Sequence, residues 1–555
     1  ICFCAMKILL EFQVLQSSWS IHTLRRLFHQ YHKTFAPLNF SYYEAISCRE
    51  QAVLKCFNFA RPSNPALWWI NGNGDEIKWS FEELGFLSQK VANMLFGTCS
   101  VIIMPGTTQL TAQDICYRLL ASKAKCIITT DALAPAVDLV ASKSQFLKAK
   151  LIVSESSRAK WLNFRLPLLI RNRVQTKSQD PMAVYFTSGT TGSPKMIEHS
   201  YGSFGLGFFL LGSYWMNLTP SDILWNMSDT AWVKAAAGSV FRPRFQGSCV
   251  FVLLFNPLFI CQTLCRYPVT TLCSAPTACH MLVQHDLTRY LFKRLKHCLT
   301  AGEPLNPNMM AQWKSQTGLN IYEGYGQTKI GMICAITKGM KIKPGSLGKA
   351  ASPYDVQIID ENGSVLPPGK EGDIAIKVDA KQPFTFFTRY VVMKTASTIR
   401  GYFYIPGDRG SMDKDGYIWF MGRSEGVIIS SRPFEIESAL REHPAVAESP
   451  VVSSPDPIRG EVVKAFVVLA PFFKSQDPKK LACELQDHDK KITTEFVQQL
   501  PKTITGKIRW NELRNKEWRD LVLINNLKRP IPINFVHRGA FLTTVSINIG
   551  FYFTH

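Results

Sequence analysis

Short apolar runs and longer helical patterns alternate along the chain from residue 41 to about residue 420. The run Met182–Phe186 is one of these predicted buried strands, and a segment rich in glycine and hydroxyl groups follows it directly. Strands that alternate with helices are typical of an α/β architecture. We therefore expect mixed sheets with helices packed against them.

The pattern changes after a turn-rich segment at Asp413–Gly416, which an apolar run and then Gly422-Arg423 follow. This order predicts a domain edge. Beyond it, a helix around Glu435–His443 and a strand at Val463–Leu469 indicate a small, compact α+β unit with a basic end at Pro501–Trp510.

The composition fits a soluble globular enzyme, since 46% of the 555 residues are hydrophobic and 19% are charged. The formal charge of +21 is compatible with nucleic acid, an anionic membrane or polyanionic small molecules. We find no RNA- or DNA-binding module, whereas ATP and coenzyme A fit the third class. The fifteen cysteines form no C-x-x-C pair or zinc-binding spacing, which predicts free thiols in a reducing compartment.

The first forty residues are basic, with Glu11 as the only acid, and this composition suits a mitochondrial transit segment. A solvated basic helix is the alternative. Near the other end, Ala540–Phe553 is apolar and aromatic but shorter than the ~20 residues that a membrane-spanning helix needs, so no transmembrane span is expected.

The segment from Tyr185 to Lys195 is the strongest indication of chemistry. Its glycines let the backbone bend so that N–H groups and hydroxyls converge on phosphate oxygens, and Lys195 adds a point charge. The spacing G-x-x-G-x-x-K differs from that of the Walker loop. A polar turn between two elements is the alternative. The predicted phosphate site consists of Thr187, Ser188, Gly189, Thr190, Thr191, Gly192, Ser193, Pro194 and Lys195.

A second glycine-rich segment follows the apolar run Leu319–Tyr322. Its small residues would let the ring of Tyr325 stack on a base and the hydroxyl of Thr328 bind a phosphate or carboxylate oxygen. Such a turn alone is weak evidence, but the phosphate loop strengthens it. The expected nucleotide contacts are Glu323, Gly324, Tyr325, Gly326, Gln327 and Thr328.

Two further charged residues fit a nucleotide site. Asp408 follows a glycine, so its carboxylate could accept hydrogen bonds from both ribose hydroxyls. Arg423, at the predicted domain edge, would hold ribose or phosphate. A solvated turn aspartate and a surface arginine are the alternatives.

In this order, the segments resemble the medium-chain acyl-coenzyme A synthetases of mitochondrial type, in the adenylate-forming superfamily. The likeness covers most of residues 9–520 and also includes Gln13–Gln16, Leu24–Phe28, Pro105–Leu110, Ser228–Trp232, Ala301–Pro304 and Pro344–Gly348. It implies a transit segment at 1–40, a large adenylation domain at 41–422 and a small mobile domain at 423–520. Residues 521–555 stay unassigned.

The resemblance also implies the reaction. A medium-chain fatty or small aromatic carboxylate attacks ATP, carried with Mg²⁺, to give acyl-AMP and pyrophosphate. Coenzyme A then displaces AMP after the small domain rotates. The implied location is the mitochondrial matrix. Partners are these small molecules and not nucleic acid, and the oligomeric state stays open.

The resemblance assigns roles to individual residues. Lys507, presented by a tight turn at Gly506, would stabilise the negative charge that develops on the α-phosphate. Thr328 is the second implied catalytic residue. Trp232 would line the acyl tunnel, and Thr190 would contact the metal. Ser431 and Arg459 would bind coenzyme A. Without the motif, Lys507 would be part of a solvated basic face and Arg459 part of a structural loop.

Four departures from the family pattern bear on activity. Lys329 stands where the family has a magnesium-binding glutamate. The paired aspartates of the hinge are Glu425-Gly426, and the loop after Ser430-Ser431 is shortened before Arg432. Residues are also missing between Thr494 and Glu495, and a strand-helix-strand passage is missing between Ser100 and Val101. The last loss would remove pairing partners from an N-terminal sheet.

The sequence thus favours an ATP-dependent acid-thiol ligase. The alternative is a catalytically impaired nucleotide- or acyl-binding protein on the same fold, because of Lys329 and the shortened hinge loop.

Overall fold

The computed structural model describes the chain in segments. These are residues 65–71, 74–87, 101–107, 109–154, 156–164, 177, 179–187, 194–207, 214–229, 231–253, 259–351, 354–378, 386–390, 398–424, 433–441, 443–456, 460–488, 492–502, 508–510, 512–514, 516–517, 545–549 and 551–554. The expected transit segment lies outside them.

The first large sheet, as far as the described residues go, has nine strands in the order β15-β14-β13-β12-β11-β9-β10-β1-β2. Its central strands are parallel, and β2, β14 and β15 run antiparallel to their neighbours. The strands are β1 (Leu67–Ile70), β2 (Glu76–Trp79), β9 (Ile223–Asn226), β10 (Cys249–Leu253), β11 (Thr271–Ser274), β12 (His297–Ala301), β13 (Ile321–Gln327), β14 (Gly331–Ala335) and β15 (Lys349–Ala350).

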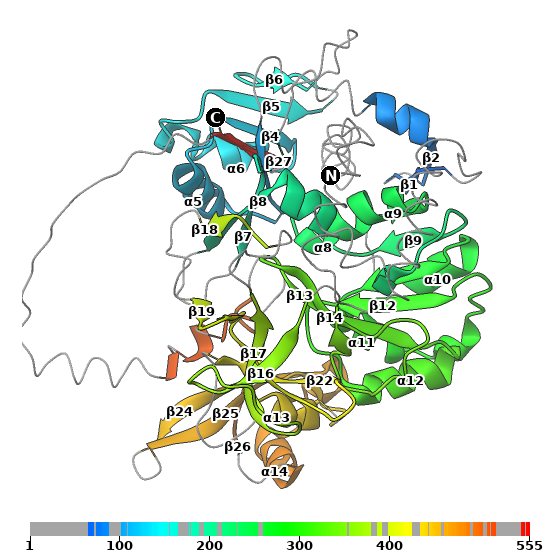
Figure 1. Ribbon diagram of the computed structural model, residues 1–555, viewed down its shortest axis with the longest axis vertical. Coiled ribbons are helices and arrows are strands. Elements are labelled where there is room, and N and C mark those ends of the chain that lie inside the picture. Colours follow the sequence, from blue (N-terminus) through cyan, green and yellow to red (C-terminus); the bar gives the residue numbers. More distant parts are fainter. Residues whose placement is uncertain are drawn as a thin grey trace, which may run out of the picture.

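Helices α10 (Ile260–Arg266), α11 (Pro276–Val283) and α12 (Pro307–Thr317) lie along this sheet (Figure 1). Local sequence sets the ends of α12. The side chain of Asn306 caps its first turn, Pro307 fits its first position, and Gly318 ends it with a φ of 73°. Trp313 of α12 is buried against the strands, so the apolar face of the helix holds it on the sheet.

The second large sheet follows the order β18-β8-β7-β3-β27-β28-β4-β5-β6 among the described strands. They are β3 (Ile102–Pro105), β4 (Cys126–Thr130), β5 (Ala149–Val153), β6 (Leu162–Asn163), β7 (Pro181–Thr187), β8 (Lys195–Ser200), β18 (Arg389–Tyr390), β27 (Val545–Ile549) and β28 (Phe551–Thr554). The short helices α5 (Ala112–Ser122) and α6 (Ala134–Asp138) accompany it, and α8 (Val233–Ala235) and α9 (Arg242–Phe245) flank a buried π-helical turn at Ala236–Phe241. The strand pair from the C-terminal segment lies between β3 and β4, and β3 begins just after the position where the sequence predicts a missing passage.

A third sheet contains β16 (Val356–Ile359), β17 (Glu371–Lys377), β19 (Ile399–Arg400), β20 (Phe403–Tyr404), β21 (Asp408–Met412) and β22 (Ile418–Arg423). The small unit after it contains α13 (Pro433–Leu440), β23 (Val446–Glu448), β24 (Val451–Asp456), β25 (Gly460–Leu469), α14 (Pro478–His488) and β26 (Ile492–Phe496). Its apolar core includes Leu440, Val467 and Leu485.

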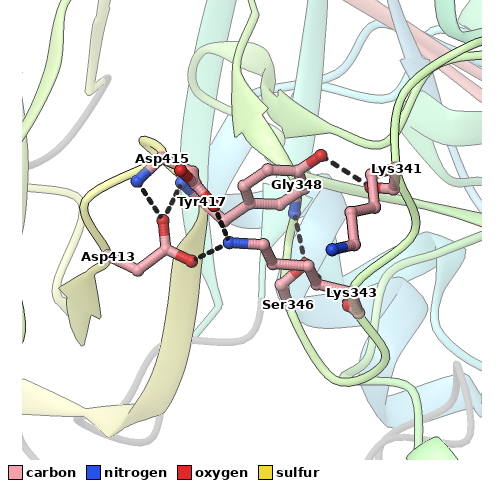
Figure 2. A network of polar contacts seen from close by, with 7 residues as sticks. All are labelled: Lys341, Lys343, Ser346, Gly348, Asp413, Asp415 and Tyr417. Carbon is pink, nitrogen blue, oxygen red and sulfur yellow. Dashed lines mark hydrogen bonds and ion pairs between the residues drawn. The ribbon is translucent and has the colours of Figure 1, made fainter.

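A polar network fastens the turn of the β21–β22 hairpin to the segment between β14 and β15 (Figure 2). Lys343 Nζ bonds Asp413 Oδ2 at 2.5 Å and Asp415 Oδ2 at 2.6 Å, and Tyr417 donates its hydroxyl hydrogen to the carbonyl of Lys341. Lys343 Nζ also lies 4.4 Å from the ring centroid of Tyr417. These contacts fix the hairpin that ends at the predicted domain edge.

The expected α/β architecture is confirmed. The predicted strand Met182–Phe186 is part of β7, and the predicted strand Val463–Leu469 is part of β25, which begins three residues earlier. The helix expected at Glu435–His443 begins at Pro433 and ends at Leu440. Among the described helices, none has the length and hydropathy to cross a bilayer.

Candidate functional site

The parallel strands β11, β12 and β13 end at one edge of the first sheet, where α/β folds usually bind ligands, and β13 carries the predicted contacts Glu323–Gln327 to it. Trp232 lies at this edge, immediately before α8. A Cβ atom at Gly302 would be 3.5 Å from Cζ3 of Trp232, and Gly302 has a φ of 110°. The proposed acyl-pocket residue therefore touches the Ala301–Pro304 loop.

Strands β7 and β8 carry the two described ends of the predicted phosphate loop. Thr187 and Lys195 are register partners, and Thr187 Oγ1 donates to the carbonyl of Lys195 at 3.4 Å. Tyr117 donates to the carbonyl of Pro194 at 3.0 Å. Ser188, Gly189, Thr190, Thr191, Gly192 and Ser193 lie outside the described residues, so their role stays a prediction.

The second glycine-rich segment differs from the expected turn, because β13 continues through Gln327. Close packing requires its glycines: a Cβ at Gly324 would be 2.8 Å from Trp215 Cε2, and one at Gly326 would be 2.2 Å from the carbonyl oxygen of Gly331. The strand thus packs closely against its neighbours, with an irregularity in its pairing to β14 between Tyr325 and Gly326, and the turn begins only at Thr328.

Glu323 is buried, and its Oε1 accepts a hydrogen bond from the backbone N–H of Leu305 at 3.2 Å. Burial raises the pKa of this carboxyl well above its ordinary value, and the bond from Leu305 opposes the shift only in part. Glu323 therefore ties β13 to the segment after the Ala301–Pro304 loop.

A polar cluster forms around the buried carboxylate of Asp408, a residue that is 2% exposed. Its Oδ2 accepts hydrogen bonds from the hydroxyl of Tyr325 and from Gln327 Nε2, the latter at 2.7 Å. Arg423 Nε lies 3.1 Å from Oδ1. Burial, and then the charge of Asp408, raise the pKa of Tyr325. The structure thus brings together four predicted nucleotide contacts, with the hydroxyl of Tyr325 bonded to Asp408.

The turn after β13 presents Thr328 and Lys329 beside this cluster. Lys329 Nζ donates to the carbonyl of Pro406 at 3.2 Å and lies 5.7 Å from the ring centroid of Tyr404. The ammonium group is therefore held against the segment that leads into Asp408.

These residues do not fit a magnesium site at the turn. Over the residues that the structure describes, no group of three or more histidine, cysteine, aspartate or glutamate side chains could hold a metal ion. An ammonium at position 329 cannot ligate a cation and repels one. Thr190, the other expected metal contact, lies outside the described residues.

Lys507, Ser431 and Arg459 also lie outside the described residues. Lys502 and Ile508, which lie on either side of the segment that contains Lys507, form an antiparallel bridge. Their assigned roles stay predictions.

Two residues that contact the predicted site segments had no signal in the sequence. Lys234 Nζ donates to the carbonyls of Ser274 at 2.6 Å and Ala301 at 3.1 Å, and so joins the ends of β11 and β12. His199 Nε2 is 2.7 Å from the carbonyl oxygen of Thr328. A lysine two residues after Trp232 and a histidine within the mixed polar and apolar segment Lys195–Ser200 are ordinary in sequence, so neither stood out.

The chain matches two family models, that of an AMP-binding enzyme over residues 91–380 and that of the AMP-binding enzyme C-terminal domain over residues 435–507. It is 55% identical to "Acyl-coenzyme A synthetase ACSM4, mitochondrial" of Rattus norvegicus, a match that covers 92% of this chain and 100% of the relative. It is 52% identical to "Acyl-coenzyme A synthetase ACSM3, mitochondrial" of Homo sapiens, over 89% of this chain and 96% of the relative. A crystal structure of the anthranilate CoA ligase AuaEII in complex with anthranoyl-AMP has a TM-score of 0.75, with 24% identity over 85% of this chain and 97% of the other. The last match supports the fold.

Proposed function

The chain belongs to the AMP-binding enzyme family and, within it, to the acyl-coenzyme A synthetases, and from this premise we propose that it joins a medium-chain fatty or small aromatic carboxylate to coenzyme A at the expense of ATP. The observation that carries the proposal is the polar cluster that Tyr325, Gln327 and Arg423 form around the buried carboxylate of Asp408. The names of the relatives support a mitochondrial location.

The first step forms a bond between a carboxylate oxygen and the α-phosphorus of ATP and releases pyrophosphate. Asp408 would accept hydrogen bonds from the ribose, which places the nucleotide at the strand ends. Lys195 and the loop before it would hold the phosphates, and Lys507 would stabilise the negative charge that grows at the α-phosphate. Trp232 would cover the acyl group beside Gly302.

In the second step the thiol sulfur of coenzyme A attacks the acyl carbon, AMP leaves, and the thiol proton is released to solvent. Ser431 and Arg459 would hold coenzyme A. We assign the first step chiefly to residues 41–422 and the rearrangement between the steps to residues 423–520. The hinge would follow Arg423, the last residue of β22.

The test is to incubate the purified full chain with ATP, Mg²⁺ and hexanoate or benzoate, and to trap acyl-AMP with hydroxylamine. A parallel reaction with coenzyme A is followed by mass spectrometry. Thioester formation is expected, and Lys507→Ala should lose the adenylate. A folded chain that binds ATP but forms neither product would favour the alternative of a nucleotide-binding protein.

A further inference from the structure

His199 lies on β8, four residues after Lys195, and is completely buried. Its Nε2 is 2.7 Å from the carbonyl oxygen of Thr328, and its Nδ1 is 3.4 Å from Ser203 Oγ. A carbonyl can only accept, so Nε2 carries the hydrogen. Burial lowers the pKa of His199 to about 4, against the opposing effect of the bond to Thr328, and the ring is therefore neutral at physiological pH.

Every backbone carbonyl of the turn at residues 327–330 has a hydrogen-bond donor. The N–H of Ile330 bonds the carbonyl of Gln327 at 3.1 Å, which closes the turn. The other donors come from distant parts of the chain: His199 to Thr328, the N–H of Phe387 to Lys329 at 2.8 Å, and the hydroxyl of Tyr354 to Ile330 at 2.7 Å. The backbone of the turn that contains Thr328 is thus held by hydrogen bonds from several parts of the chain.

Strand β8 is itself tied to the segment that holds Lys329. Arg389 bonds both carboxylate oxygens of Glu198, at 3.1 and 3.0 Å, and the N–H of Thr388 bonds the carbonyl of Glu198 at 2.8 Å. Phe387, whose N–H bonds the carbonyl of Lys329, directly precedes Thr388 in this segment. Strand β8 therefore reaches the turn twice, through the His199 ring and through residues 387–389.

Strand β8 also begins at Lys195, the last residue of the phosphate loop. Lys195 and His199 point to the same face of the strand, since side chains alternate with a period of two. One rigid strand therefore connects the two segments that would contact the ATP phosphates.

We propose that His199 is a positioning residue for adenylate formation: its Nε2–H group sets the Thr328 turn at the distance from Lys195 that the reaction needs. This inference rests on the proposed function. The imidazole does not touch the reacting atoms. It acts through the Thr328 carbonyl, and its loss would let Thr328 move relative to Lys195.

A purely structural role is the competing explanation, because removing any buried histidine destabilises a fold. The chain offers a matched control. His297 is also buried, and its Nε2 is 3.1 Å from a backbone carbonyl, that of Trp215. It lies at the first residue of β12, away from the Thr328 turn. His297→Leu should cost stability in the same manner as His199→Leu.

The experiment compares His199→Leu, His199→Gln and His297→Leu in the full chain, with adenylate formation, melting temperature and the affinity for a fluorescent ATP analogue as readouts. We expect His199→Leu to lower the kcat for adenylate formation about 10- to 100-fold, the size expected for one lost buried hydrogen bond in a reacting geometry. His199→Gln, whose amide reaches the position of Nε2, should stay within about threefold of wild type. His297→Leu should lower the melting temperature and leave kcat unchanged.

Equal kcat values for the two leucine variants would overturn the proposal, as would a failure of glutamine to rescue. If His199→Leu does not fold, His199→Asn takes its place, because its shorter amide mimics Nδ1 and not Nε2. If the wild type forms no adenylate, the proposed function has failed and hydrogen exchange decides the inference separately. Faster exchange of the Ile330 amide in the His199 variant than in the His297 variant supports the positioning role, and equal exchange rejects it.

Discussion

Arg423 lies opposite Asp408 on the β21–β22 hairpin, with its Nε 3.1 Å from Oδ1 of the carboxylate. Asp408 is buried, whereas the Arg423 side chain is 55% exposed. The pair therefore joins a buried carboxylate of the proposed nucleotide site to the exposed end of β22. The binding of a nucleotide to Asp408 would therefore depend on the position of this strand end, after which the chain continues into the small unit.

Asp408→Asn should weaken ATP binding without unfolding the chain. The asparagine still accepts from Tyr325 and Gln327 but loses the charge that would strengthen bonds from ribose. A hydrogen bond to a charged group is worth about 1.5–3 kcal/mol, so the KM for ATP should rise about 10- to 100-fold. Asp373→Asn is the matched control, because Asp373 is buried in the same sheet and paired with Arg400, and neither residue is a predicted nucleotide contact. The same rise in KM for both variants would count against the ribose role of Asp408.

Lys329→Glu should increase adenylate formation and make it depend more steeply on Mg²⁺. A lysine repels a cation at this turn and a glutamate attracts it, each by about 4 kcal/mol at 4 Å with an effective dielectric near 20. Lys329→Gln separates the two effects, since it removes the repulsion and adds no attraction. Initial rates are measured across a range of Mg²⁺ concentrations. A rate for the glutamate variant at or below that of wild type would show that Lys329 serves this chain in another way, for example by holding phosphate directly.

Gly326→Ala should destabilise the protein and abolish adenylate formation. The added Cβ would be 2.2 Å from the carbonyl oxygen of Gly331, so β13 and β14 would have to separate. We expect a loss of about 2–3 kcal/mol in the free energy of unfolding. Gly85→Ala is the control, because Gly85 lies in a helical segment and its Cβ would meet nothing within 4 Å. That variant should gain about 0.5–1 kcal/mol. Denaturant unfolding measures both, and a Gly326→Ala variant as stable as wild type would contradict the packing argument.

The sequence predicted the parts of the site that local patterns determine. Strand β7 ends at Thr187, where the apolar run gives way to the glycines and hydroxyls of the predicted phosphate loop, and the motif before Thr328 has its own spacing. The sequence alone could not predict that the Tyr325 hydroxyl bonds Asp408, because the two residues are 83 positions apart. The bond from His199 to Thr328 spans 129 positions. Such pairings depend on how strands pack.

The sequence also did not predict where the C-terminal segment pairs in the fold. Because the sequence indicates that a strand-helix-strand passage is missing near residue 100, it predicts that strands of the N-terminal sheet lack pairing partners. In the structure, β28 pairs with both β3 and β4 in that sheet. No pattern in residues 521–555 indicates this position, because a strand's pairing partner is chosen by the exposed sheet edges available to it and not by its own sequence alone.

Lys343→Met should weaken the acid dependence of stability. Burial raises the pKa of Asp413, but hydrogen bonds from Lys343 and from the backbone N–H groups of Tyr417 and Asp415 outweigh it, and the pKa is lowered. Hydrogen bonds to Asp413 and Asp415 raise the pKa of Lys343. The stability from Asp413 is present above its ordinary pKa near about 4 and is lost as pH falls through the lowered value. The stability that Lys343 contributes is present below about pH 10.4 and is lost as the pH rises through the raised pKa of Lys343.

The wild-type melting temperature should therefore be highest between about pH 5 and pH 10 and should fall below about pH 4. In Lys343→Met this acid-side fall should be smaller, because Asp413 loses its main side-chain partner. Lys341→Met is the control, since Lys341 is exposed and joins the network through its carbonyl (Figure 2). Because the hairpin that Lys343 fastens also carries Asp408 and Arg423, Lys343→Met should raise the KM for ATP at neutral pH as well. An unchanged acid-side fall would show that the ion pairs are screened by solvent, and an unchanged KM would show that the hairpin keeps its place without them.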